Sequence, residues 1–262
     1  MNMDTPAIEE GEAGGLSNIA WVLALLGLVV AIADAIAGLF AGIGYRLDLW
    51  DYRSGAGALR YVFWLATGTA AVSALGVALG AMSGGRGAVA AGIAGFAIAV
   101  ITAYVPWHLR ETIQSLPPIH DISTDLVNPP QFVKIAELRR KDDHPVTYDG
   151  PDVAAQQRQA YPDVLPLVLQ APAEKVFETA KAVLIGMGLE LVTADPALGR
   201  IEATETSLLF GFEDDVVVRI AEVADGTTRV DVRSKSRVGR SDLGTNANRI
   251  RIFSIKLLRK LG

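Results

Sequence analysis

The sequence predicts two parts of different fold class, an α-helical membrane region with three transmembrane helices and an α+β domain with an antiparallel sheet. Two observations predict this division. Three long apolar runs fill the first 108 residues, whereas beyond Arg110 the apolar residues recur at the spacings of short strands and amphipathic helices. With 262 residues, 50% of them hydrophobic, the chain is long enough to build both parts.

The overall charge and the cysteine count exclude several kinds of function. The formal net charge is −5, and because binding to a phosphate backbone needs a basic surface, we expect no nucleic-acid partner. The chain contains no cysteine, which rules out disulfides, thiolate catalysis and metal sites built from cysteine.

The membrane region is expected over residues 18–108, behind a disordered tail of residues 1–17. Each of its three apolar runs reaches or exceeds the roughly 20 residues with which a helix crosses the hydrocarbon layer. The runs cover residues 18–45, 61–82 and 87–107. The first run is not a cleaved signal peptide, because the tail before it is acidic and lacks Lys and Arg. Aromatic residues gather near the first loop and at the end of the third run, where an interfacial belt is expected.

Loop charge predicts the orientation of the three spans. One side of the membrane region holds only Arg86, and the other side holds Arg46, Arg53, Arg60 and Arg110. By the positive-inside rule the large C-terminal part is cytoplasmic. We therefore expect a multi-pass protein of the bacterial inner (cytoplasmic) membrane, with the lipid bilayer as its permanent partner.

One carboxylate lies in the middle of the first run. Asp34 there costs about 2.5–3.5 kcal/mol on insertion scales, so we expect it to face other helices rather than lipid. We interpret it as a buried residue that is hydrogen-bonded to Ser73 or Thr67, and a proton or ion relay is the alternative. Two Gly-x-x-x-Gly spacings, which begin at Gly38 and Gly76, allow close helix approach within one chain or between the protomers of a homo-oligomer.

Residues 109–163 are predicted to form a proline-rich connector that packs on the domain behind it. The prolines break any long element and leave room for short helices over residues 131–140 and 152–161, the second with a cap at Asp152.

Four polar residues of the connector could ligate a metal, namely His120, Asp121, Asp125 and His144. They lack the fixed spacing of a helical or loop metal motif. Because turns that use Asp, Ser and Thr side chains explain the same residues, we predict no metal and no cofactor.

The remaining residues, 164–262, are predicted to form the α+β domain. Alternation with a period of two defines the strands, and an apolar stripe at helical spacing defines the helix between them. In order, the predicted elements are an edge strand over residues 164–169, a helix from Pro172 to Gly188, and strands over residues 189–194 and 200–206.

Two further strands, residues 215–223 and 228–237, are predicted to form a hairpin. Val218 lies on the same face as Val232 only if the connecting loop has an odd number of residues, so we expect a three-residue turn at residues 225–227. This face is apolar, and the opposite face carries Arg219, Arg229, Asp231, Arg233 and Lys235.

The last element is predicted to be a helix over residues 243–260, capped by Ser241 or Asp242. Its apolar stripe must cover the apolar face of the sheet. The order strand, helix, four strands and helix therefore predicts an antiparallel sheet with helices packed on one face, a helix-grip-like sandwich.

Several separated segments behind the membrane region carry a recognisable pattern. They are residues 117–125, 129–132, 156–157, 160–163, 199–204, 210–219 and 230–239. Together and in this order they resemble the domain of unknown function 1499 family. The resemblance runs from about Pro117 to the end of the chain and implies a protein of a bacterial or plastid envelope, but it implies no reaction. Some members place this domain outside the cytoplasm, in contrast to the loop charge, so the resemblance leaves the side of the membrane open.

The densest polar stretch, residues 230–251, combines a strand, a turn and the start of a helix. We predict a site around the turn that also draws residues from the acidic segment before the hairpin and from the connector. The candidate ligand-binding residues are Arg219, Arg237, Arg240, Asp242, Asn246, Arg249, Asp214, Asp215, His120 and Asp121. A structural network of ion pairs is the competing explanation for these charges.

The preferred function is a membrane-tethered binding or scaffold domain for an anionic ligand, a lipid headgroup or a partner membrane protein. The alternative is a membrane-anchored hydrolase that uses His120 with Asp121 and Asp214 with Asp215, and it predicts a pocket that joins the connector to Asp214 and Arg237. A transporter-like role of the three spans is a third hypothesis. The sequence identifies no catalytic residue.

Overall fold

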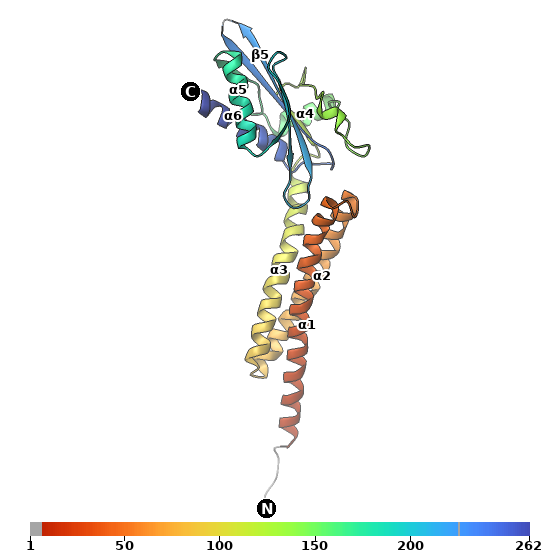
Figure 1. Cartoon of the computed structure of the whole chain (residues 1–262). Coiled ribbons are helices and arrows are strands. Elements are labelled where there is room, and N and C mark those ends of the chain that lie inside the picture. Colours follow the sequence, from red (N-terminus) through yellow and green to blue (C-terminus); the bar gives the residue numbers. More distant parts are fainter. Residues whose placement is uncertain (1–6, 225) are drawn as a thin grey trace, which may run out of the picture. The chain divides into compact units, whose positions relative to one another are not determined.

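The computed structural model describes residues 7–224 and 226–262 and shows two compact units (Figure 1). The first unit is Met1–Glu111 and the second is Thr112–Gly262. The first is helical, and the second is built around an antiparallel sheet with helices on one face, which confirms the predicted fold class.

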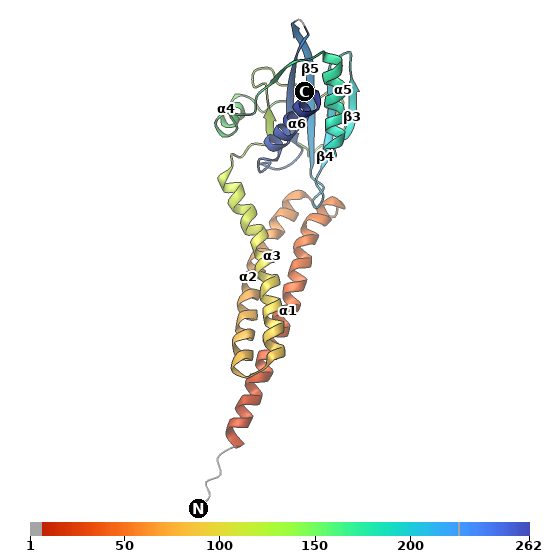
Figure 2. The same ribbon diagram turned by 90° about the vertical axis from the view of Figure 1, so that its left-hand side faces the viewer.

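Three long helices make up the first unit and lie side by side in Figures 1 and 2. They are α1 (Ala7–Arg46), α2 (Tyr52–Met82) and α3 (Arg86–Ser115). All three are long and apolar enough to cross a membrane, as the sequence predicts. Because α1 begins at Ala7, the prediction of a disordered tail is wrong for residues 7–17, whose Ala and Glu residues are good helix formers. Residues 1–6 of that predicted tail lie outside the described residues.

Small residues let these helices approach each other closely. A Cβ atom added to Gly76 of α2 would lie 2.8 Å from the backbone nitrogen of Ala24 in α1. A Cβ atom at Gly80 would lie 3.2 Å from Ala88 at the start of α3. The second Gly-x-x-x-Gly spacing therefore serves contacts within one chain.

Asp34 of α1 is buried, with 2% of its surface exposed. The expected hydrogen bond to a neighbouring helix is wrong, because no described residue bonds to either carboxylate oxygen of Asp34 or to the hydroxyl of Ser73. Thr67 instead donates its hydroxyl to the carbonyl oxygen of Phe63 in its own helix, at 2.7 Å.

The second unit contains an antiparallel sheet of six strands among the described residues. The strands are β1 (Asp121–Ser123), β2 (Leu167–Gln170), β3 (Glu190–Asp195), β4 (Arg200–Thr206), β5 (Glu213–Ala224) and β6 (Thr227–Ser236). Their order is β1-β6-β5-β4-β3, and β2 pairs with the same edge of β6 as β1 does. The sequence missed β1, which lies inside the predicted connector.

Two helices, α5 (Ala173–Gly186) and α6 (Thr245–Leu261), cover one face of this sheet (Figure 1). Their buried side chains form the main core with the apolar face of the hairpin. In the hairpin Val218 pairs with Val232 and Ile220 pairs with Val230, so the predicted common face is confirmed.

The hairpin turn differs from the expectation. Ala224 pairs with Thr227, so Thr227 belongs to β6 and only residues 225 and 226 connect the strands. An irregularity between Glu222 and Ala224 supplies the extra residue and keeps the apolar side chains on one face. Residue 225 of the predicted turn lies outside the described residues.

The middle of the predicted connector, about residues 128–149, lies on the other face of the sheet, whereas Ile119, Ile122 and Tyr161 of the same connector pack into the main core. Residues 131–140 form only the short 3-10 helix η1 (Ile135–Glu137) instead of the expected helix. The second expected helix is α4 (Pro151–Ala160), whose cap is Gly150 rather than Asp152, because proline is suited to the first helical position. The connector contributes Phe132 and Ile135 to a small second core on Val217.

The last helix begins two residues later than expected, because Gly244 adopts a left-handed conformation at its cap. Asp242 still serves the helix start, since its two carboxylate oxygens accept the N–H groups of Gly244 at 3.0 Å and Asn246 at 2.8 Å.

Candidate functional site

The sheet divides the predicted site residues between its two faces, since neighbouring residues of a strand point in opposite directions. Asp214 of β5 pairs with Arg249 of α6 at 2.7 Å, on the helical face. The next residue, Asp215, pairs with Arg139 of the connector at 2.8 Å, on the other face. Since Arg237 also reaches Asp215, Arg237 and Asp214 form their ion pairs on opposite faces of the sheet.

The Asp121 cluster, which comprises Asp121, Asp149, Arg233 and Lys235, lies under the connector. Arg233 donates two hydrogen bonds of 2.8 Å to the two oxygens of Asp121, and both side chains are fully buried. Lys235, which is equally buried, lies 3.2 Å from Asp121 and 2.6 Å from Asp149. Arg233 also donates to the carbonyl oxygens of Pro130 and Val146. The connector therefore packs on the buried cations of β6, Arg233 and Lys235.

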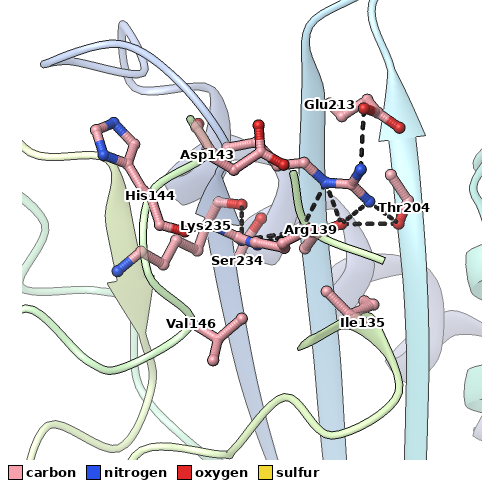
Figure 3. Close-up of polar contacts among 12 residues, drawn as sticks. Ile135, Arg139, Asp143, His144, Val146, Thr204, Glu213, Ser234 and Lys235 are labelled. Atoms are coloured by element: carbon pink, nitrogen blue, oxygen red, sulfur yellow. Dashed lines mark hydrogen bonds and ion pairs between the residues drawn. The ribbon is translucent and has the colours of Figure 1, made fainter. Parts of the chain in front are cut away.

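The Asp215 cluster, which comprises Asp215, Arg139, Arg237, Thr204 and Glu213, continues this layer. Asp215 is fully buried and accepts hydrogen bonds from both arginines. Thr204 donates its hydroxyl to Asp215 at 2.8 Å. Arg237 reaches on to Glu213 at 2.9 Å. Figure 3 shows Arg139, Thr204 and Glu213 converging at this point between the connector and the sheet.

The two arginines that share Asp215 respond differently to their surroundings. Burial lowers the pKa of Arg139, although the Asp215 carboxylate opposes this. Burial acts against the charge of Arg237 as well, but Asp215 and Glu213 outweigh it and raise its pKa. Both guanidinium groups stay protonated at neutral pH, so neither arginine can act as a base.

The Arg219 cluster comprises Arg219, Arg229, Asp125 and Asp231. It lies on the same face of the sheet as the other two clusters, nearer the hairpin turn. Arg219 lies 2.9 Å from Asp125 and 2.8 Å from Asp231. Arg229 reaches the same two carboxylates at 3.0 and 2.9 Å. Arg219 also donates to the carbonyl oxygen of Asn128 in the connector, at 3.0 Å.

On the helical face, Arg249 and Asn246 tie α6 to the sheet. Arg249 pairs with Asp214 and with Glu205. Asn246 accepts a hydrogen bond from Ser234 at 2.6 Å and donates one to the carbonyl oxygen of His120 at 3.0 Å. Of the turn residues predicted as a site, Arg240 is exposed, whereas Asp242, Asn246 and Arg249 are buried.

His120 does not contact the carboxylate of Asp121 that the hydrolase alternative assigns to it. Its Nε2 atom lies 3.3 Å from Asp149, and its ring stacks on His144 with 4.0 Å between the centroids. Burial, followed by the neighbouring His144, lowers the pKa of His120 despite the nearby carboxylates. The Nδ1 atom of His120 is buried without a hydrogen-bond partner among the described residues. Within residues 7–224 and 226–262, no three His, Asp or Glu side chains are placed to hold a metal ion.

Sequence reasoning missed the connector half of these clusters. Arg139 contacts Asp215 across 76 residues, and no spacing predicts such a pair. Glu202 of β4 is fully buried and accepts the backbone N–H groups of Val133 at 2.9 Å and Ile135 at 2.8 Å. The only available signal was a charged residue between the buried Ile201 and Ala203, which predicts an outward-facing side chain but not its partner.

A cavity of about 200 Å³ opens where the connector meets β4 and β5. It is lined by Pro130, Gln131, Leu198, Arg200, Val217 and Arg219. Arg200 and Arg219 are direct neighbours across the two strands, so two guanidinium groups border the same cavity. We call it the arginine cavity.

The C-terminal part of the chain matches a known protein family. The model of a family described as protein of unknown function (DUF1499) matches residues 121–257, which is more than half of the chain. The matched segment begins with β1 and ends inside α6, so it contains the complete sheet and the arginine cavity. No curated protein matches the chain.

Proposed function

Since the chain belongs to the DUF1499 family of proteins of unknown function, its function has to be argued from its own residues, and we propose a membrane-anchored binding domain whose ligand is a small anion. Helices α1–α3 provide the anchor. The arginine cavity provides the binding site.

One observation carries this proposal, the incomplete hydrogen bonding of Arg200. Its Nε atom is buried and has no hydrogen-bond partner among the described residues. The nearest carboxylate, Glu202, lies 3.5 Å away and is already occupied by two backbone N–H groups. Buried donors without an acceptor are rare in folded proteins because each costs free energy. The Arg200 side chain is 26% exposed, so its guanidinium group is accessible to an acceptor from outside the chain.

The chemistry of the cavity selects an anion. Two arginines at directly opposite positions of neighbouring strands repel each other unless negative charge lies between or beside them. Asp125 and Asp231 neutralise Arg219 in this way, whereas Arg200 pairs, among the described residues, with Glu202 alone, at a longer distance of 3.5 Å. A guanidinium group binds phosphate or carboxylate through two parallel hydrogen bonds. A volume of about 200 Å³ admits a phosphate or a short carboxylate, and it is smaller than the sites of drug-sized ligands.

The contacts of the other charged residues favour binding over the hydrolase alternative. Asp121 is held by two buried cations, and His120 is packed between Asp149 and His144. These residues connect the connector to the sheet, which supports a rigid scaffold around the arginine cavity.

The test is a titration of the full-length protein, reconstituted in nanodiscs of zwitterionic lipid, with inorganic phosphate. We expect saturable binding to the wild-type protein, and a loss of affinity of about tenfold or more in Arg200→Gln, because charge-assisted hydrogen bonds to the anion are removed. Arg251→Gln is the matched control, since Arg251 of α6 forms a partly exposed ion pair with Asp163 and does not line the cavity.

Two results would overturn the proposal: absence of phosphate binding to the wild-type protein, or equal affinity in Arg200→Gln and the wild type. Nanodiscs that contain an anionic phospholipid identify the natural source of the anion. If a lipid headgroup occupies the cavity, added phosphate must compete with it and its apparent affinity falls; if the ligand is a free anion, the affinity stays the same.

We propose the bacterial inner membrane as the location, with the second unit in the cytoplasm. The four arginines on that side of the spans, against Arg86 alone on the other, support this orientation.

A further inference from the structure

The loop between β4 and β5, residues 207–212, presents apolar side chains to the outside. Its sequence is Ser-Leu-Leu-Phe-Gly-Phe, and we call it the apolar tip. Leu208 is 89% exposed and Leu209 is 41% exposed. The rings of Phe210 and Phe212 stack with 4.9 Å between their centroids. An exposed apolar cluster of this kind marks a surface that contacts something apolar.

The apolar tip is a closed, hydrogen-bonded loop. Ser207 donates its backbone N–H to the carbonyl oxygen of Phe212 at 2.8 Å, and Phe212 donates its N–H to the hydroxyl of Ser207 at 2.8 Å. Gly211, at a positive φ of 68°, donates to the carbonyl oxygen of Ser207 at 3.0 Å. The apolar side chains are therefore held at the end of two strands by a fixed backbone, so little conformational entropy is lost when they are buried.

The apolar tip lies at the end of the sheet where the chain arrives from α3. Ser236 donates its N–H to the carbonyl oxygen of His120, just before β1, at 3.0 Å. The next residue, Arg237, donates to the carbonyl oxygen of Glu213, which directly follows the tip, also at 3.0 Å. His120 and Glu213 thus flank the same end of β6, about 10 Å apart at ordinary strand spacing.

Chain length keeps this end of the sheet within reach of the bilayer. Residues 116–120 separate the end of α3 from β1, and five extended residues span at most about 18 Å. The apolar run of the third span ends at residue 107, and the helical residues that follow it add about 12 Å.

We propose that the apolar tip inserts into the interfacial layer of the bilayer that α1–α3 cross. Leu208, Leu209 and the stacked rings of Phe210 and Phe212 supply the apolar surface, as in other proteins that lie partly in a membrane interface. Arg240 is exposed in the loop after β6, at the same end of the sheet, where its charge attracts anionic headgroups. The second unit is then held at the membrane by two attachments, the covalent one through α3 and this one.

The absence of cysteine from the chain makes a direct test simple. Leu208→Cys and the control Val223→Cys each carry one environment-sensitive fluorophore on the full-length protein in nanodiscs. Val223 is 54% exposed, and it lies near the opposite end of β5. With brominated acyl chains in the lipid, we expect the fluorescence at position 208 to fall at least twofold and the fluorescence at position 223 to stay unchanged.

Equal quenching at the two positions, or none at position 208, would overturn the proposal. A blue-shifted but unquenched signal at position 208 would overturn it as well, because it would mean that the tip packs on protein. Leu209→Cys repeats the measurement if the label at position 208 disturbs folding. The outcome is independent of phosphate binding, since no residue of the apolar tip lines the arginine cavity.

Discussion

Asp121 contacts two fully buried cations, Arg233 and Lys235, and Asp149 supplies the second negative charge through its pair with Lys235. Taking such charges out of water costs several kcal/mol each, and only the mutual contacts offset that cost. Asp215 has the same role for Arg139 and Arg237. Residues of this kind contribute little net stability as intact groups, yet the loss of one partner leaves a charge buried without compensation.

Asp121→Asn keeps the shape of the side chain and removes its charge. We expect the second unit to lose about 3–5 kcal/mol of unfolding free energy, as measured for broken buried pairs. Asp163→Asn breaks the partly exposed pair with Arg251 and should cost at most about 1 kcal/mol. Pulse proteolysis in urea is the suitable measurement, because all four Trp residues lie in the membrane region and report little on this unit. Similar losses in the two variants would contradict a special role of Asp121.

His120 makes the stability of the second unit depend on pH. Its pKa in the folded state lies below the ordinary value of 6.5 because of burial and His144. The unfolded chain therefore binds a proton that the folded chain does not, and stability falls as the pH decreases below about 6.5. The slope contributed by this residue is at most about 1.4 kcal/mol per pH unit, the value for one proton.

His120→Gln should remove this slope, since Gln keeps a donor for Asp149 but does not titrate. Unfolding free energies at about pH 7.5 and about pH 5.5 provide the measurement. An unchanged pH dependence in the variant would show that other groups cause it.

At the scale of elements, close packing of backbones holds the membrane helices together. Gly76 touches the backbone of α1, whereas Gly68 of the same helix has open space around it. Substitutions at these two glycines of α2 therefore separate the effect of helix packing on stability from the effect of helix propensity.

Gly76→Ala should destabilise the helical region by about 1–3 kcal/mol, because its Cβ atom would lie 2.8 Å from a backbone nitrogen and the helices would have to move apart. Gly68→Ala should be neutral or stabilise by up to about 1 kcal/mol through the higher helix propensity of Ala. Thermal unfolding in detergent, followed by Trp fluorescence, measures both. A neutral Gly76→Ala variant would mean that the contact between α1 and α2 is looser than described.

The spacing of apolar residues predicted those elements that have one apolar, buried face and one polar face. α5, α6 and the strands from β3 to β6 were found in this way. β1 was missed because it has only three residues and all are buried, so it shows no alternation. The sequence also predicted which residues share the charged face of β6, since alternate residues of a strand point to the same face. It could not predict that Arg139 pairs with Asp215 of β5 or that Asp149 pairs with Lys235 of β6, because connector residues without regular structure leave no pattern.

At the scale of the whole molecule, the side of the membrane decides which solution the arginine cavity meets. The chain offers single-cysteine labelling for this question as well. Lys141 is exposed in the connector, and Met82 is exposed at the end of α2 that leads into the loop on the other side of the spans.

In intact cells, a membrane-impermeant maleimide should label Met82→Cys and should label Lys141→Cys only after permeabilisation, as expected if the connector is cytoplasmic. The opposite pattern would place the second unit outside the cytoplasm and would show that loop charge does not determine the orientation of this protein.

The pairing of β1 with β6 also sets an order of events during synthesis. Asp121 and Arg233 are 112 residues apart, so the segment that leaves the membrane first has no partner strand until almost the whole chain has been made. At about 5–20 residues per second, this delay lasts about 6–22 seconds. An apolar segment would be prone to aggregation during that time. The connector carries its own charged residues, among them Asp121 and Asp149, which water solvates until Arg233 and Lys235 have been made and can pair with them.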